Sequence, residues 1–363
     1  ISLLLRHSLR LTNLSDRLNV RVLAEANTIN YDLSWRISLS SFSLYLNLRA
    51  GFKHENGQLK LYDLDVGNLR IPKDWTGQLV KIVESTVLDS TAGYILVERF
   101  LEQITIKSIG SSKINVQLEW EPEFLSELST HAQRWFISAE DKERIIRHYL
   151  LINDVVTTIP TNIRAISMID LLEGTFAAAY ESSLAGADPL AENRTLLQTL
   201  AIYVNNENIA KLIGSEAASD LPVARFIEVR LLRRQDLAQH VASVAAITAS
   251  LGPEFAALLS TTKETYDARY RSGFSFSDLT ANSVGVTLAS LAMQDRNSAI
   301  EMQKRLSELR TESDFMPEIG NNRDGLSEST FSAIYADSSS AEYIQKVNEI
   351  RDAIEAKPIF QGL

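Results

Sequence analysis

The residues best suited to chemistry lie in the second half of the chain, where an aspartate and a histidine stand four positions apart. Asp236 and His240 share one side of a helix if their segment is helical. A carboxylate at that spacing can hold the imidazole in one tautomer and raise its basicity, which serves both general-base chemistry and metal ligation. The competing interpretation is a partly buried histidine satisfied by its own helix neighbour, because His240 borders an apolar stripe through Val241 and Val244.

A second carboxylate, Glu192, and a cation, Arg194, follow the pair Asp188-Pro189, which is typical of a helix N-cap and first turn. Near a helix N-terminus these two side chains could orient a polar or anionic ligand. In the structural alternative, Glu192 is an ordinary first-turn acid and Arg194 forms a surface or inter-helix ion pair.

A glycine-containing loop provides the remaining candidates. Glu264 and Asp267 precede this loop, and Ser275 and Asp278 follow its glycine with the spacing of a capping box. Phenylalanines flank Ser275, so we expect the loop to pack inward rather than extend into solvent.

These segments support one hypothesis, a polar cleft in the helical region. If the loop packs against His240, several carboxylates surround this histidine, which suits hydrolysis or metal binding. The alternative is an ordinary corner between two helices. In the hydrolase hypothesis His240 is the base and Asp236 orients it. The candidate catalytic residues are His240, Asp236, Glu192 and Glu264, and the candidate binding residues are Arg194, Asp267, Ser275 and Asp278.

Composition excludes several familiar sites. The 363-residue chain has no cysteine, which rules out disulfides, thiolate metal sites and cysteine nucleophiles. Its five histidines lack paired spacing, and the chain contains no Walker A, GxGxxG or GxSxG motif. We therefore expect no cofactor and no dedicated metal site. The formal net charge of −10 argues against nucleic-acid binding, because there is no basic excess to displace counterions.

The elements that must position these residues divide near Pro122. Residues 1–122 carry 14 Lys+Arg and 13 Asp+Glu, whereas residues 123–363 carry 22 and 33. The period of the apolar residues changes at the same place. We therefore predict two domains, 1–122 and 123–363, and a cationic partner, if the chain has one, is expected at the acidic second domain.

The first domain has a period of two from Arg17 to Arg70, interrupted by the hairpin signal Asn56-Gly57. A helical spacing over Trp75–Leu88 and a further hairpin around Gly110 complete the unit. The pattern predicts an α+β domain, mainly antiparallel β with one or two helices. Its apolar stripe Phe42–Leu48 is either one wall of a lipid-binding groove or a sheet face covered by that helix.

After Pro122 the period is helical, which predicts an all-α domain. Small residues lie between Leu237, Val241, Val244 and Thr248, so we expect close helix packing there. Ile166, Ile169, Leu172 and Phe176 are predicted to share one helix face, and a final helix over Tyr343–Ile354 follows a serine-rich cap.

Parts of both domains resemble uncharacterised proteobacterial cell-envelope proteins. The runs that carry the resemblance are Tyr45–Leu48, Gly57–Leu61, Val66–Pro72, Glu192–Arg194, Asp236–His240 and Ser272–Leu279. The resemblance implies a two-part layout and the envelope of a Gram-negative bacterium, but no established activity. In that pattern an acidic residue follows the alanine after the loop, whereas here Asn282 follows Ala281. If that acid serves an activity, this chain lacks it.

The chain begins at Ile1 rather than at methionine, and its opening apolar run is too short for a signal-peptide core. We expect a periplasmic protein, or one anchored upstream of Ile1 and facing the periplasm, with a cytoplasmic protein as the alternative. The leading hypothesis is a tethered, non-catalytic binding or scaffold protein for a protein partner or an apolar ligand. The alternatives are an envelope hydrolase acting on glycan or peptide and a lipid-binding protein that uses the N-terminal sheet. Whether the chain is an enzyme stays open.

Overall fold

The chain folds into two compact units, residues 1–131 and 132–363, and each is described by itself. The computed structural model describes residues 18–25, 27–39, 42–55, 58–67, 69–70, 104–109, 114–118, 137–253, 256, 273–320, 322–337 and 340–362. The expected domain boundary at Pro122 lies outside these ranges, so that boundary stays a prediction. The α+β class is confirmed, because a mainly antiparallel sheet precedes a helical region.

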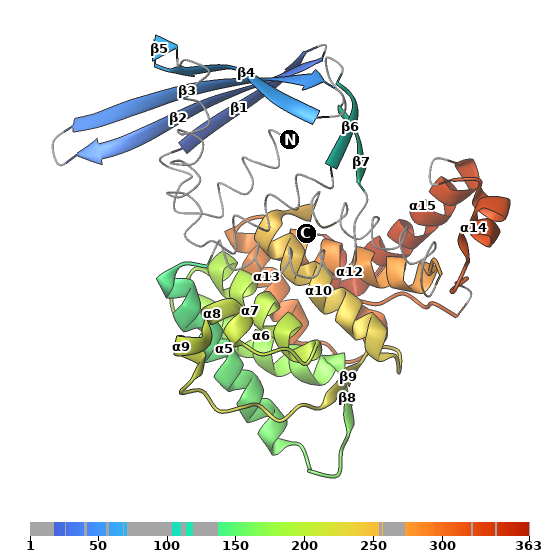
Figure 1. Ribbon diagram of the computed structural model, residues 1–363. Coiled ribbons are helices and arrows are strands. Elements are labelled where there is room, and N and C mark those ends of the chain that lie inside the picture. The colour runs from blue at the N-terminus through green and yellow to red at the C-terminus, as the bar shows by residue number, and fades with distance from the viewer. Residues whose placement is uncertain are drawn as a thin grey trace. The chain divides into compact units, whose positions relative to one another are not determined.

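The first unit contains an antiparallel sheet in which each strand pairs with the next along the chain (Figure 1). Its strands are β1 (Leu18–Glu25), β2 (Thr28–Leu39), β3 (Phe42–Glu55), β4 (Gln58–Val66) and β5 (Leu69–Arg70). A separate antiparallel pair consists of β6 (Ile104–Ile109) and β7 (Ile114–Leu118). Both predicted hairpins are confirmed: Glu55 pairs with Gln58 across two residues, and β6 returns into β7.

The period of two gives the sheet one apolar and one polar face, because successive side chains point to opposite sides. On the apolar face Ile29, Ala50 and Leu64 are buried, and the rings of Tyr31 and Phe52 meet edge to face at 5.6 Å. The helix predicted over Trp75–Leu88 lies outside the described residues.

The second unit is predominantly helical. Its long helices are α5 (Ala139–Thr158), α6 (Met168–Leu184), α7 (Pro189–Val204), α10 (Gln235–Leu251), α12 (Phe276–Ala292), α13 (Arg296–Ser307) and α15 (Ala341–Glu355). The shorter elements are α8 (Ala210–Ile213), α9 (Ser215–Ala218), α14 (Glu328–Tyr335) and the 3-10 turns η1 (Glu312–Asp314) and η2 (Pro358–Phe360). Among the described helices, none is both long and apolar enough to cross a membrane.

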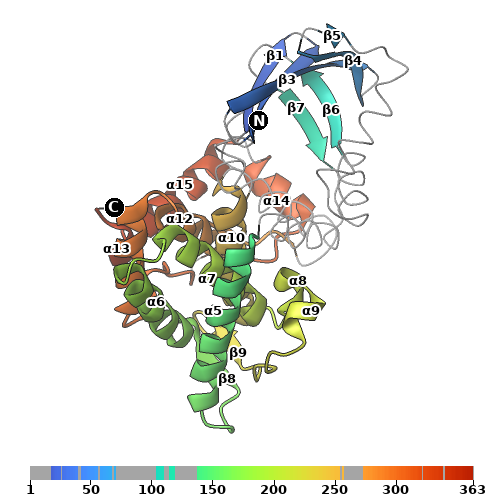
Figure 2. The same ribbon diagram turned by 90° about the vertical axis from the view of Figure 1, so that its left-hand side faces the viewer.

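The helical unit also contains strands that the sequence did not predict. β8 (Ala165–Ser167) and β9 (Glu228–Arg230) pair in parallel, and Figures 1 and 2 show them side by side at one end of the unit. Ile166, expected on a helix face, therefore lies in a strand, and this region is not entirely α-helical. Strands of three residues are too short to show a period in the sequence.

α7 is the central helix of this unit and packs against α5, α6, α10 and α13 (Figure 2). It begins at the predicted cap, where Asp188 accepts a hydrogen bond of 3.1 Å from the Leu190 amide and Pro189 occupies the first turn. Side chains are buried all around it. The polar residues of its first turns, Glu192 and Asn193, are therefore 1% and 0% exposed.

α10 and α12 approach very closely, as the small residues predicted. A methyl group added at Gly285 of α12 would lie 2.7 Å from the Val241 carbonyl oxygen of α10. The residues that lead into α12 pack through aromatic side chains. Phe274 and Phe276 are buried, which confirms inward packing for the part of the loop from Gly273 onward. Phe274 also exchanges backbone hydrogen bonds with Leu326. The last helix begins at a serine cap, Ser340, as predicted.

Candidate functional site

A strained turn lies directly before α10, beside the first cluster of candidate residues. Leu232 and Arg233 both have positive φ, 51° and 66°, between the paired residues Leu231 and Arg234. Such a conformation costs on the order of 1–3 kcal/mol per residue other than glycine. The Glu312 carboxylate accepts a hydrogen bond of 2.8 Å from the Leu232 amide and so braces the turn. The turn brings the Arg234 side chain to the start of α10.

The guanidinium of Arg234 connects three carboxylates from different segments. It donates to Asp236 at 3.1 Å, to Asp324 at 3.0 Å and to Asp278 at 3.3 Å. The hydrogen bonds to Asp236 raise the pKa of Arg234 against the opposing effect of burial. The guanidinium in turn lowers the pKa of Asp236. We call the group Arg234, Asp236, His240, Asp278, Asn282 and Asp324 the Arg234 cluster.

His240 completes this cluster between two side chains of α12. Its Nδ1 lies 2.8 Å from the amide oxygen of Asn282, and its Nε2 lies 3.4 Å from the carboxylate of Asp278. Both ring nitrogens thus face oxygen acceptors. A general base needs a nitrogen that faces its substrate, so catalysis at His240 requires one of these two contacts to open.

The serine that caps α12 holds the cluster to the loop. Ser275 accepts a hydrogen bond of 3.0 Å from the Asp278 amide and donates one of 2.9 Å to Asp324. Ser275 is therefore the N-cap that its spacing predicts, while the Asp278 carboxylate faces Arg234 and His240. Partial burial raises the pKa of Asp324, but hydrogen bonds from Ser277, Ser275 and Arg234 outweigh it and the net pKa is lowered.

Glu192 belongs to a different group, between α5 and α7. Its carboxylate forms an ion pair with Arg147, lies 3.7 Å from Arg144 and lies 3.2 Å from Nε2 of His148. Arg194 donates to Asp141 at 2.8 Å. We call the group Asp141, Arg144, Arg147, His148, Glu192 and Arg194 the α5–α7 charge cluster.

His148 is a buried residue of this second cluster that the sequence analysis did not single out. It is 2% exposed, and neither its Nε2 nor Oε2 of Glu192 has a hydrogen-bonding partner in suitable orientation among the described residues. Burial raises the pKa of Glu192, but the proximity of His148 and Arg147 outweighs it and lowers the pKa. The signal in the sequence was the spacing of Asp141, Arg144 and His148, which places them on one face of α5.

In the described part of the chain, the residues that were expected to line one cleft thus belong to two separate groups. Asp236, His240 and Asp278 are together, but the carboxylate that approaches the ring of His240 is Asp278 rather than Asp236. Glu192 and Arg194 have their own partners in the α5–α7 charge cluster. Glu264 and Asp267 lie outside the described residues, so their roles stay predictions.

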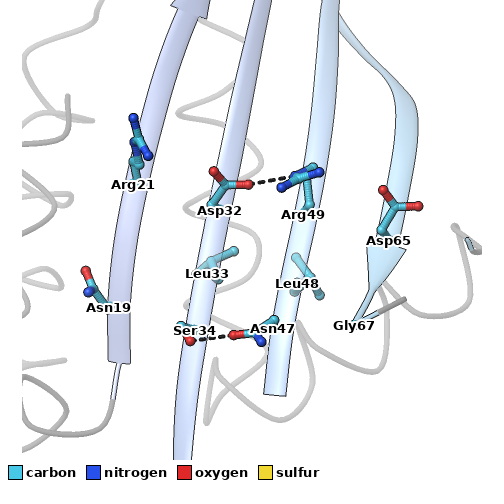
Figure 3. A pocket seen from close by; sticks show the side chains of 10 residues that line it. All are labelled: Asn19, Arg21, Asp32, Leu33, Ser34, Asn47, Leu48, Arg49, Asp65 and Gly67. Carbon is cyan, nitrogen blue, oxygen red and sulfur yellow. Dashed lines mark hydrogen bonds and ion pairs between the residues drawn. The ribbon is translucent and has the colours of Figure 1, made fainter. Parts of the chain in front are cut away.

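A third group lies on the polar face of the N-terminal sheet (Figure 3). Side chains from adjacent strands line up in two rows across it. One row is Asn19, Ser34 and Asn47, and the other is Arg21, Asp32, Arg49 and Asp65. Ser34 donates to Asn47, and Arg49 donates to Asp32 at 2.9 Å. We call these seven residues the polar sheet face.

The polar sheet face surrounds a hollow of about 480 Å³ that Leu33, Leu48 and Gly67 also line. This site was not predicted from the sequence, because the period of two was read from the apolar residues of the strands and the polar residues between them carry no motif. The hollow is lined mainly by charged and amide side chains. The lipid hypothesis concerns the apolar stripe Phe42–Leu48 of β3 and stays a prediction.

Metal binding has no candidate in the described ranges, where no three His, Asp or Glu side chains are arranged to hold an ion. In all three groups the described side chains form hydrogen bonds and ion pairs. Compared with known proteins, the chain matches no family model, no curated protein and no solved structure.

Proposed function

We propose that this protein is a non-catalytic binding protein whose N-terminal sheet contacts the ligand and whose helical unit is a stable scaffold. One contrast carries the proposal. Hydrogen-bonding groups on the polar sheet face surround an open hollow, whereas the described catalytic candidates bond to neighbouring groups of the chain. The groups on the polar sheet face also bond to one another, but the Arg49–Asp32 pair is exposed, so a ligand can replace such contacts, whereas Glu192 and His240 are largely buried with their partners.

The residue next to His240 supports a non-catalytic role. The resemblance places an acid after Ala281, and this chain has Asn282, whose amide oxygen is the group 2.8 Å from Nδ1 of His240. A carboxylate at that position would orient the imidazole and strengthen it as a base, whereas an amide supplies no charge. The residue that differs from the pattern, Asn282, is therefore the one that contacts Nδ1 of His240. A catalytic histidine depends on this contact for its orientation.

The cell envelope is part of this proposal, on the strength of the resemblance. A binding protein tethered upstream of Ile1 would hold its ligand at the membrane surface. The acidic helical unit would offer a second surface to a cationic partner.

The test compares ligand retention by the wild type and a sheet variant. We expect the full chain to bind at least one of three probes: a mixture of extended peptides, phospholipid vesicles or soluble oligosaccharides. Asn19→Ala combined with Asn47→Ala should weaken that binding about tenfold or more, because two hydrogen bonds are lost. Lys53→Ala is the matched control, since Lys53 is exposed on the same strand but does not line the hollow.

Two outcomes contradict the proposal. One is retention that is equal in the wild type and the double variant. The other is turnover of a probe that His240→Gln abolishes. This second outcome would favour the envelope hydrolase. The strained turn at Leu232 and Arg233 supports that alternative, because such strain is common at active sites.

A further inference from the structure

Two exposed tyrosines lie on the same side of the sheet as the hollow. Tyr45, Asn47 and Arg49 are alternate residues of β3, so their side chains share one face. Tyr62 joins this face from β4 at the register shift beside Gly51. Its hydroxyl donates to Asn30 at 3.0 Å, and its ring lies where a methyl group on Gly51 would be. Tyr45 is 64% exposed and Tyr62 is 41% exposed, so both rings are accessible to a ligand.

The charged side chains known to line the hollow are equal in number and opposite in sign. Arg21 and Arg49 oppose Asp32 and Asp65, so the described part of the lining has no formal net charge. A surface that recruits anions or cations needs an excess of one sign, because the field of paired charges is short-ranged. The balance therefore favours a ligand that is itself neutral but rich in hydrogen-bonding groups.

The side chains around the hollow offer donors and acceptors next to one another. Asn47 has an amide oxygen and an amide nitrogen, Arg49 supplies a planar fork of donors, and Asp65 supplies two acceptors. Adjacent hydroxyls of a sugar ring donate and accept at a similar spacing. Tyrosine rings provide flat apolar surfaces for the C–H face of such a ring, with a polar tip that stays in water.

From this combination, the geometry points to a neutral oligosaccharide as the ligand of the polar sheet face. The inference deepens the proposed function and rests on it. From Tyr45 to Gly51, beside which Tyr62 lies, β3 rises about 20 Å, at about 3.3 Å per residue. This length exceeds a single sugar ring, so the sheet fits a chain of several.

The alternative macromolecule, an extended peptide, is less well matched. Peptides that add to a sheet bind along a free strand edge through backbone hydrogen bonds. The hollow instead lies across the face of β1, β2, β3 and β4, and of these strands only β1 has an edge without a partner strand among the described residues. A peptide added at that edge would reach Asn19 and Arg21, but across the rest of the hollow it would have to bind by side chains alone.

The experiment measures binding of the full chain to neutral hexasaccharides of glucose and of N-acetylglucosamine by titration calorimetry. We expect at least one hexasaccharide to bind. Tyr45→Ala should weaken it about tenfold, the effect of losing one stacked ring, whereas Tyr45→Phe keeps the ring and should stay within about twofold. Tyr45 is exposed, so both variants should fold, and Lys53→Ala should bind as the wild type does.

The outcomes separate this inference from the proposed function. Loss of binding in both Tyr45 variants, or in neither, overturns stacking on a sugar and with it the inference. If neither hexasaccharide binds but a peptide mixture binds and Asn19→Ala/Asn47→Ala abolishes it, the oligosaccharide inference fails and the proposed function stands. If no probe binds in a way that depends on these two asparagines, both fail.

Discussion

The two units contain arginine–aspartate pairs of nearly the same length in very different surroundings. In the sheet, Arg49 donates to Asp32 at 2.9 Å with side chains 66% and 34% exposed. In the helical unit, Arg194 donates to Asp141 at 2.8 Å with side chains 14% and 5% exposed. An exposed pair is screened by water and salt, whereas removing one partner of a buried pair leaves a charge without compensation. Distance alone therefore does not distinguish a replaceable pair from an essential one.

The comparison also bears on function. Charges that stabilise the fold are costly to move and cannot easily serve a ligand. Those of the α5–α7 charge cluster lie between two helices, one of them the central helix α7. The Arg49–Asp32 pair of the polar sheet face is exposed to water, so a ligand can exchange one hydrogen bond for another there.

The largest effect is expected from Asp141→Ala. This change removes the acceptor of both Arg144 and Arg194 in a position that is 3% exposed. We expect the free energy of unfolding of the helical unit to fall by about 3 kcal/mol, the lower end of the range for broken buried pairs, because both arginines keep some contact with water. Urea unfolding followed by far-UV circular dichroism measures it. A decrease in the free energy of unfolding of less than about 1 kcal/mol would show that this pair contributes no more than an exposed pair does.

A smaller effect, and one that depends on pH, is expected from Glu192→Gln. The folded state lowers the pKa of Glu192, so the ionised carboxylate stabilises the fold above its unfolded pKa of about 4.5 and this stabilisation disappears as pH falls through the lower folded-state pKa. At pH 7 the glutamine should cost about 2 kcal/mol, the usual contribution of a hydrogen bond to a charged group.

The measurement is urea unfolding of the wild type and Glu192→Gln at a series of pH values. Glutamine resembles the protonated acid, so the two proteins should become equally stable in acid. A difference that stays constant below pH 4.5 would show that shape rather than charge is responsible.

Much of the fold was predictable because its signals are local. The period of two placed β1 to β4 within a few residues, and Asp188, Ser275 and Ser340 marked the starts of α7, α12 and α15. Each of these depends on residues only a few positions apart. The pair β8–β9 was missed because strands that pair over 63 positions and contain three residues each leave no local pattern.

The candidate site was less predictable for the same reason. The helical spacing of Asp236 and His240 was correct, but the ring contacts Asp278 and Asn282, which are 38 and 42 positions away. A spacing of four positions indicates contacts within one helix only. It therefore cannot predict that a carboxylate from another helix lies closer to the ring. Glu192 likewise pairs with Arg147, 45 positions away.

The space around the glycines also allows the packing of the two units to be compared. Alanine at Gly285 would bring a methyl group within 2.7 Å of a backbone oxygen, whereas alanine at Gly51 would meet the ring of the half-exposed Tyr62. A backbone oxygen cannot move away, but a tyrosine at the surface can rotate. We expect Gly285→Ala to cost about 1–2 kcal/mol, because overpacking exceeds the gain in helix propensity.

Gly174→Ala is the matched control within the helical unit. Its added methyl group meets only Val155, at an ordinary 3.6 Å, so the change should stabilise the unit by up to about 1 kcal/mol. Thermal unfolding of the three variants tests the order Gly174→Ala, Gly51→Ala, Gly285→Ala from most to least stable. Equal losses at Gly51 and Gly285 would show that the sheet is as tightly packed as the helices.

The smallest effect is expected from Asp32→Ala, the counterpart of Asp141→Ala on the sheet. The raised pKa of Arg49 shows that Asp32 stabilises its charge, followed by smaller effects of Asp65 and Asp63. Because Asp65 and Asp63 remain and water reaches the guanidinium, stability should stay within experimental scatter in low and in high salt. The same variant should nevertheless weaken oligosaccharide binding, since it removes an acceptor from the hollow. A large loss of stability would mean that the polar sheet face holds the fold together, and the division between a scaffold and a binding face would then be wrong.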